Sequence, residues 1–88
     1  MLLHREEYVH PSQASRVRIN VYDYQPESPV AGLGPRERGY AVTEDRVGTV
    51  TVVASLGYFE EREKAFEAAR SRGRELQAQR YRSSTPAA

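Results

Sequence analysis

The chain has 88 residues, which limits it to one small domain, and its net charge of +1 gives no overall basic field that would attract nucleic acid. It contains no cysteine, which excludes disulfides, thiolate nucleophiles and zinc–thiolate sites. No apolar run approaches the roughly 20 residues of a membrane span, so we expect a cytoplasmic protein that does not contact membranes.

The first fifteen residues have no clear periodicity. Their apolar side chains are scattered among charged ones and fit neither a period of 2 nor one of 3.6. Pro11 and the polar residues after it indicate a connector. A short helix over residues 2–8, an extended arm lying on a neighbouring subunit and plain disorder all stay open, so we describe residues 1–15 as a poorly defined N-terminal arm.

Residues 16–24 give the clearest strand signal. Val17, Ile19 and Val21 alternate with polar residues, which is the period of 2 expected when one face of a strand is buried and the other meets water. The polar face would carry Arg16, Arg18, Asn20, Tyr22 and Tyr24.

Two further strands are expected after a long loop. Residues 25–37 contain three prolines and two glycines and predict the loop. Residues 38–43 predict a short strand, 44–46 a polar turn and 47–54 a third strand. Val53 lies on the otherwise polar face of that third strand, which predicts that the strand is central in the sheet or partly covered on its outer face.

One long charged segment, from Gly57 to about Arg82, predicts a helix, with Phe59 turning inward just before it. Gly73 costs about 1 kcal/mol of helix propensity relative to Ala, so a helix that ends at Gly73 is an alternative. A narrow stripe of residues at three- and four-residue spacing would face the sheet. This stripe is Arg62, Ala65, Phe66, Ala69, Gly73, Leu76 and Arg80.

A helix of this length exceeds the length of the strands. At about 1.5 Å per residue it would run roughly 30 Å, so its last third would overhang the sheet. We therefore expect Leu76 and Tyr81 to be available to a partner, and residues 83–88 to form a disordered tail.

The sequence offers no catalytic constellation. His4 and His10 are its only histidines, and both lie in the poorly patterned N-terminal arm. No nucleophile with a base and an orienting group can be named. We predict no enzymatic activity, no cofactor and no metal site.

Two features are candidate binding surfaces. The polar face of residues 16–24 combines guanidinium groups with aromatic rings, with Thr49 and Thr51 expected beside it, as in sheets that bind single-stranded nucleic acid. The arginine-rich end of the helix is the second, because arginines suit a phosphate backbone. The candidate residues are Arg16, Arg18, Tyr22, Tyr24, Arg70, Arg74 and Tyr81.

An aromatic pair and an acidic helix start follow the last predicted strand. The run Leu56-Gly57-Tyr58-Phe59 is followed by Glu63, Ala65, Phe66 and Ala69. In this layout the chain resembles small bacterial β-β-β-α modules, among them the partial double-stranded-RNA-binding-like domain of HicB-type antitoxins. The resemblance covers roughly residues 16–80 and implies three strands followed by a helix, but it carries over no functional residue.

The predicted fold is α+β: a three-stranded, mainly antiparallel sheet within residues 16–82, with one long C-terminal helix packed across one face. Such a sheet leaves one edge and one face open, which favours pairing. We predict a small non-enzymatic binding or regulatory module that acts through protein contacts. Its partner would be a second copy, which gives a homodimer, or another protein. The alternative is a nucleic-acid-binding module that uses the open sheet face and the C-terminal arginines.

Overall fold

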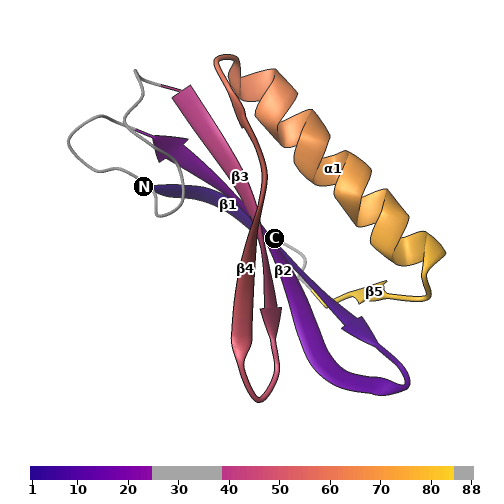
Figure 1. The fold of residues 1–88 in the computed structure, drawn as a ribbon. Helices are drawn as coiled ribbons and strands as arrows, with labels where there is room; N and C mark the ends of the chain where they lie inside the picture. The colour runs from indigo at the N-terminus through magenta and orange to yellow at the C-terminus, as the bar shows by residue number, and fades with distance from the viewer. Residues whose placement is uncertain (25–38, 85–88) are drawn as a thin grey trace.

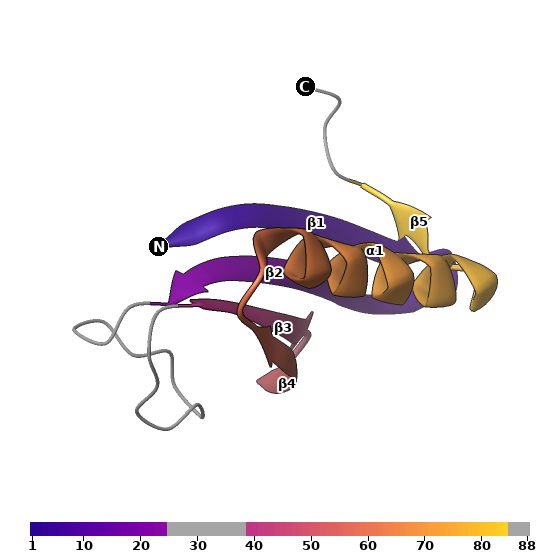
Figure 2. The ribbon, with the colours of Figure 1, turned by 90° about the horizontal axis from the view of Figure 1, so that it is seen from above.

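The computed structural model describes residues 1–24 and 39–84, which form one antiparallel sheet with a helix against one of its faces (Figure 1). The elements are β1 (Leu2–His10), β2 (Gln13–Tyr24), β3 (Gly39–Val47), β4 (Thr51–Phe59), α1 (Arg62–Ala78) and β5 (Arg82–Ser83). The strands lie in the order β4-β3-β2-β1-β5. Figure 2 shows α1 lying over the sheet along the direction of β1 and β2. The predicted loop at residues 25–37 lies outside the described residues.

The α+β class with one helix on an antiparallel sheet is confirmed, but the predicted number of three strands is wrong. In the described part of the chain the sheet has five strands, four of them long. The additional strands are β1 and β5, which come from the predicted N-terminal arm and the start of the predicted tail. Ser83 pairs with Tyr8 of β1, so the disordered tail does not begin at residue 83. Residues 85–88 lie beyond the described part of the chain.

Strand β1 has no visible alternation because its inner face carries polar residues. Tyr8 pairs with Val17 and Glu6 with Ile19, so both side chains point to the helix side of the sheet. There Tyr8 donates a hydrogen bond to Glu6 Oε2 over 3.1 Å, and Glu6 Oε1 lies 3.4 Å from His4 Nε2. Because these polar side chains form hydrogen bonds and ion pairs with one another, they can occupy the inner face. The apolar–polar alternation that marks a strand in the sequence is then absent.

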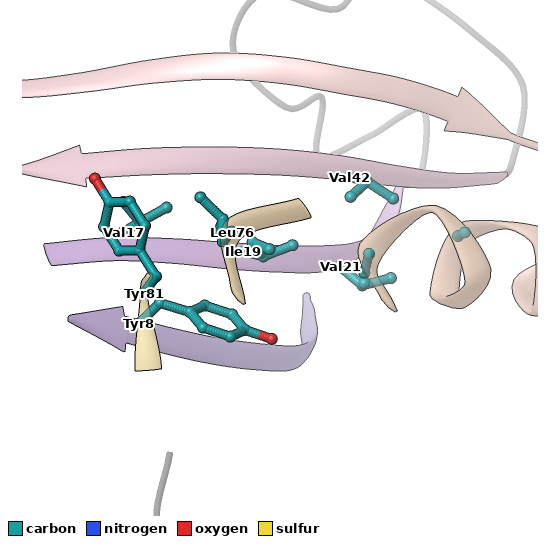
Figure 3. Packing of buried hydrophobic residues seen from close by; sticks show 9 residues of the cluster. Tyr8, Val17, Ile19, Val21, Val42, Leu76 and Tyr81 are labelled. Carbon is teal, nitrogen blue, oxygen red and sulfur yellow. The ribbon is translucent and has the colours of Figure 1, made fainter. Parts of the chain in front are cut away.

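Strand β2 is confirmed, and its Val17, Ile19 and Val21 are fully buried beneath the helix. They form the centre of one hydrophobic core that links three strands to the helix and to the segment after it (Figure 3). The buried residues of this core are Tyr8, Val17, Ile19, Val21, Val42, Ala65, Ala69, Leu76 and Tyr81.

The polar turn predicted at residues 44–46 is wrong. Strand β3 continues to Val47, and the turn lies at residues 48–50. Glu44 is 6% exposed and faces the helix, where Arg72 Nε donates to its Oε1 over 2.6 Å. Three consecutive charged residues are typical of an exposed turn. Here Glu44 and Asp45 are bonded by Arg72 of α1 and Asn20 of β2, partners that the local sequence does not reveal.

Helix α1 confirms the middle of the predicted stripe, since its buried residues are Ala65, Ala69, Gly73 and Leu76. The two ends of the stripe are wrong, because Arg62 and Arg80 are exposed and Arg80 lies beyond the end of the helix. The alternative that Gly73 ends the helix is wrong, because the helix continues to Ala78. A Cβ atom at Gly73 would overlap the Tyr8 hydroxyl and lie 3.2 Å from Tyr8 Cζ. Glycine at this position therefore lets the helix approach β1 closely.

The expectation that Leu76 and Tyr81 overhang the sheet is also wrong. Leu76 is fully buried and Tyr81 is 6% exposed. After the helix the chain turns at Arg80, whose φ is 73°, and β5 then pairs with β1. The Tyr81 hydroxyl donates to Gln13 Oε1 over 3.1 Å, which fixes the tyrosine against the start of β2.

The buried Tyr8 hydroxyl makes stability sensitive to alkaline pH. Burial, with a smaller effect of the Glu6 charge, raises the pKa of Tyr8 from 10.0 to about 12. The folded protein keeps this proton at pH values where the unfolded chain loses it. The stability that Tyr8 contributes is therefore complete below pH 10.0 and is lost as the pH rises to about 12.

We expect the free energy of unfolding to fall by at most about 2.7 kcal/mol over this pH range, because each pKa unit of the Tyr8 shift corresponds to about 1.36 kcal/mol. Urea denaturation at a series of alkaline pH values measures it. Tyr8→Phe removes the ionisable group and is expected to flatten this part of the curve. An equally steep decline in Tyr8→Phe would assign the pH dependence to another group.

Candidate functional site

The sheet face opposite the helix is organised around Asn20, which is fully buried. Arg5 Nε donates to Asn20 Oδ1 over 2.6 Å, and Asn20 Nδ2 donates to Thr43 Oγ1 at 3.2 Å and to Asp45 Oδ2 at 3.0 Å. The register places Arg5, Asn20 and Thr43 side by side on β1, β2 and β3. This face is thus an internally bonded polar layer.

The predicted arginines on this face have acidic partners. Arg16 Nη1 lies 3.3 Å from Glu7 Oε1, and Arg18 Nε lies 3.7 Å from the same oxygen. Tyr22 lies on the same face and is half-buried, and Tyr24 ends the strand. Glu7 offsets one of these two charges, and Asp45, opposite Arg18 on the same face, is a second carboxylate. The two acids leave only one of the three guanidinium charges of this face, counting Arg5, without a compensating charge, so the face presents little net positive charge to a phosphate.

The expected threonine neighbours lie elsewhere. Thr49 is in the turn between β3 and β4. Thr51 pairs with Val47, and Val47 pairs with Arg16. Thr51 therefore lies on the same face as Arg16 but two strands away from it.

The helix arginines lie on the other side of the sheet from Arg18 and Tyr22. Arg70 and Arg74 each donate a hydrogen bond to Glu67, over 3.0 and 3.1 Å. These hydrogen bonds hold the pKa of Glu67 below its ordinary value, and the bond from Arg74 has the larger effect. The structure therefore separates the two halves of the predicted nucleic-acid surface. It also places Tyr81 in the core, which removes that residue from any exposed surface.

Both histidines take part in contacts within the fold. The His4 ring lies 5.5 Å from the Phe66 ring, and the His10 ring meets the Tyr81 ring edge-on at 5.1 Å. The backbone N–H of Ser12 donates to His10 Nδ1. In residues 1–24 and 39–84, no group of three or more His, Asp or Glu side chains is placed to hold a metal ion.

A shallow hollow of about 530 Å³ lies beside the first half of α1. Its described lining is Arg62, Glu63, Phe66 and Arg70, and the Arg62 guanidinium lies 5.2 Å from the centre of the Phe66 ring. All four of these described lining residues come from the helix.

The outer edge of β4 is the most unusual surface of the described chain. Within the described residues β4 pairs with β3 on one side and with no strand on the other. The sequence from Gly48 to Phe59 contains no charged residue. Val50, Val52 and Val53 are 73%, 58% and 63% exposed. An uncharged edge with exposed β-branched side chains is a template for pairing with another strand.

The opposite edge of the sheet is protected. β5 pairs with Tyr8 and Val9 of β1, and the Ser84 N–H donates to the Glu7 carbonyl oxygen over 2.8 Å. The rest of β1 carries charged side chains, which discourage edge-to-edge pairing. The two edges of one sheet are therefore built in opposite ways.

Sequence reasoning missed this edge and predicted the strand with Val53 to be central or covered. That prediction is wrong, because β4 is the last strand of the sheet and Val53 is exposed. The sequence holds no local signal for the edge, because a run without a charge, such as that from Gly48 to Phe59, is equally typical of a central strand.

Comparison of the chain with protein-family models, curated proteins and solved structures finds no match. The resemblance to HicB-type modules therefore stays a prediction. Among the described residues, α1 is too short and too polar to cross a membrane.

Proposed function

We propose that the protein is a small non-enzymatic binding module that acts through protein contacts and associates with a second copy of itself. The observation that carries this proposal is the uncharged edge of β4, beside which residues 1–24 and 39–84 place no further strand. The engagement of both histidines in contacts within the fold supports a binding role over a catalytic one. The separation of Arg18 and Tyr22 from the helix arginines makes nucleic acid the less favoured partner.

A second copy fits the β4 edge because the edge is compatible with itself. Two identical strands can pair antiparallel about a two-fold axis, which gives a closed dimer with the same surface on both subunits. The absence of charge in residues 48–59 means that no like charges meet in this arrangement. The exposed side chains of Val52 and Val53 would pack across the new strand pair.

The short edge predicts a weak dimer. Regular pairing of β4 with β3 runs from Thr51 to Ser55 before the register shifts between Val42 and Thr43. A pairing of this length buries less than the roughly 1,200 Å² of a standard interface. We therefore expect a dissociation constant on the order of micromolar, which suits reversible assembly.

Sedimentation velocity over about 1–500 µM tests the proposal. We expect the weight-average mass to rise with concentration from monomer to dimer. Val53→Lys places two ammonium groups near the two-fold axis, so it is expected to raise the dissociation constant at least about tenfold.

Val50→Lys is the matched control, since Val50 is at least as exposed as Val53 but lies in the turn before β4. We expect it to weaken association less than Val53→Lys. A wild-type protein that stays monomeric across the whole range would refute self-association.

A further inference from the structure

The straight part of β4 defines where a second strand can pair. Thr51, Val52, Val53, Ala54 and Ser55 follow one register against β3, and the register then shifts by one residue around Leu56. Gly57 has a φ of 143°, a backbone conformation that residues with a side chain rarely adopt. A bulge bends and twists a strand, so regular pairing on the outer edge is expected to stop there as well.

The middle of this straight segment is Val53. Resting on the proposed self-association, we infer that two copies pair β4 against β4 antiparallel, with the two-fold axis at Val53. In such a pair each residue lies opposite the one equally far from the axis on the other side. Val53 then faces Val53 of the second copy, Val52 faces its Ala54, and Thr51 faces its Ser55.

These pairs match in both chemistry and direction. Val52 lies opposite Arg46 and Ala54 opposite Glu44, so both point to the helix side of the sheet. Thr51, Val53 and Ser55 point to the other side, which places small hydroxyls against hydroxyls and valine against valine. β-branched pairs and hydroxyl pairs of this kind stabilise neighbouring strands.

The arrangement also fixes the shape of the dimer. Because paired residues share a face, the two helices lie on the same side of one continuous sheet, with five strands from each copy. The two-fold axis runs perpendicular to that sheet. The edge formed by β1 and β5 lies at both outer ends, and its β5 pairing and charged side chains disfavour growth beyond two copies.

Disulfide cross-linking tests this register, and the chain suits the method because it contains no cysteine. Residues directly opposite in an antiparallel pair have Cα atoms about 4.5–5.5 Å apart, which is within the range that a disulfide spans. Val53→Cys is therefore expected to form a covalent dimer under mild oxidation. Thr51→Cys mixed with Ser55→Cys is expected to form the mixed dimer.

Val50→Cys is the control. In the inferred register its counterpart in the second copy is six residues away along the strand, roughly 20 Å. We expect Val53→Cys to cross-link at least about ten times faster, because the dimer holds its two thiols at a high effective concentration. Both variants should have the circular dichroism spectrum of the wild type.

The outcomes separate the two proposals. If the wild type dimerises in sedimentation but Val50→Cys cross-links as fast as Val53→Cys, the register at Val53 is refuted while self-association stands. If Thr51→Cys links to itself faster than to Ser55→Cys, the register is refuted too. A monomeric wild type refutes both proposals.

Discussion

Ending the chain after Gly73 is expected to unfold the domain. Such a truncation removes Leu76, which is fully buried, and Tyr81, which packs in the same core and donates a hydrogen bond to Gln13 of β2. It also removes β5 and leaves the outer edge of β1 without a partner. The last turns of the helix are therefore structural and do not form a separable appendage.

The magnitude follows from the lost core. Removing a buried leucine side chain costs about 2–5 kcal/mol, and a large aromatic about 3–5 kcal/mol. The sum is comparable to the whole stability of a domain of this size, roughly 5–10 kcal/mol. We expect far-ultraviolet circular dichroism of the truncated chain to show no cooperative urea transition.

A chain ended after Ser84 is the control, since it retains β5 and the hydrogen bond from Ser84 to Glu7. It is expected to unfold with a midpoint close to that of the full chain. A folded, cooperative protein ending at Gly73 would contradict this interpretation of the helix and restore the idea of an overhanging segment.

Arg72→Leu is expected to destabilise the protein by about 3 kcal/mol, because it leaves the buried Glu44 carboxylate with a weaker set of partners. Arg72 Nε donates to Glu44 Oε1 over 2.6 Å, and this bond raises the pKa of Arg72 above its ordinary value. After the change, Arg46 Nε at 3.3 Å is the described cation that still faces Glu44. Chemical denaturation at neutral pH measures the loss.

The double change Glu44→Leu with Arg72→Leu is expected to recover most of this stability, since buried ion pairs can often be replaced by apolar pairs at little cost. Arg70→Leu is the control on the same helix. Arg70 pairs with Glu67 in an exposed position, where solvent screens the charges, so its loss should change stability far less than the loss of Arg72. Equal effects of Arg70→Leu and Arg72→Leu would show that the burial of Glu44 does not matter.

The parts of the fold that the sequence predicted are those whose inner faces are apolar. Strand β2 and the stripe of α1 were found because Val17, Ile19 and Val21, and then Ala65 and Ala69, repeat with the period of their element. Strand β1 and the end of β3 were missed because Glu6 and Glu44 occupy inward positions. Their partners come from side chains that a local pattern does not reveal.

The candidate site depends on strand order, which no local pattern contains. The same β4 sequence would be an ordinary central strand if β1 had paired beside it. Likewise, Arg18 was predicted correctly on the polar face of β2, but its neutralising partner Glu7 comes from β1. An interface built from long-range pairing becomes visible only when the register of all the strands is known.

The pairing of β5 with β1 has a consequence for the order of folding. The other strand pairs join neighbours along the chain: β1 with β2 across residues 11–12, β3 with β4 across residues 48–50, and β2 with β3 across residues 25–38. Each of these pairings closes a shorter stretch of chain, at a lower entropic cost, than a pairing between the two ends of the domain. Ser83 and Tyr8, by contrast, are separated by most of the chain. Contacts of such sequence separation form late and slow the final step. We therefore expect the protein to complete its protected edge last, after the hairpins and the helix have formed.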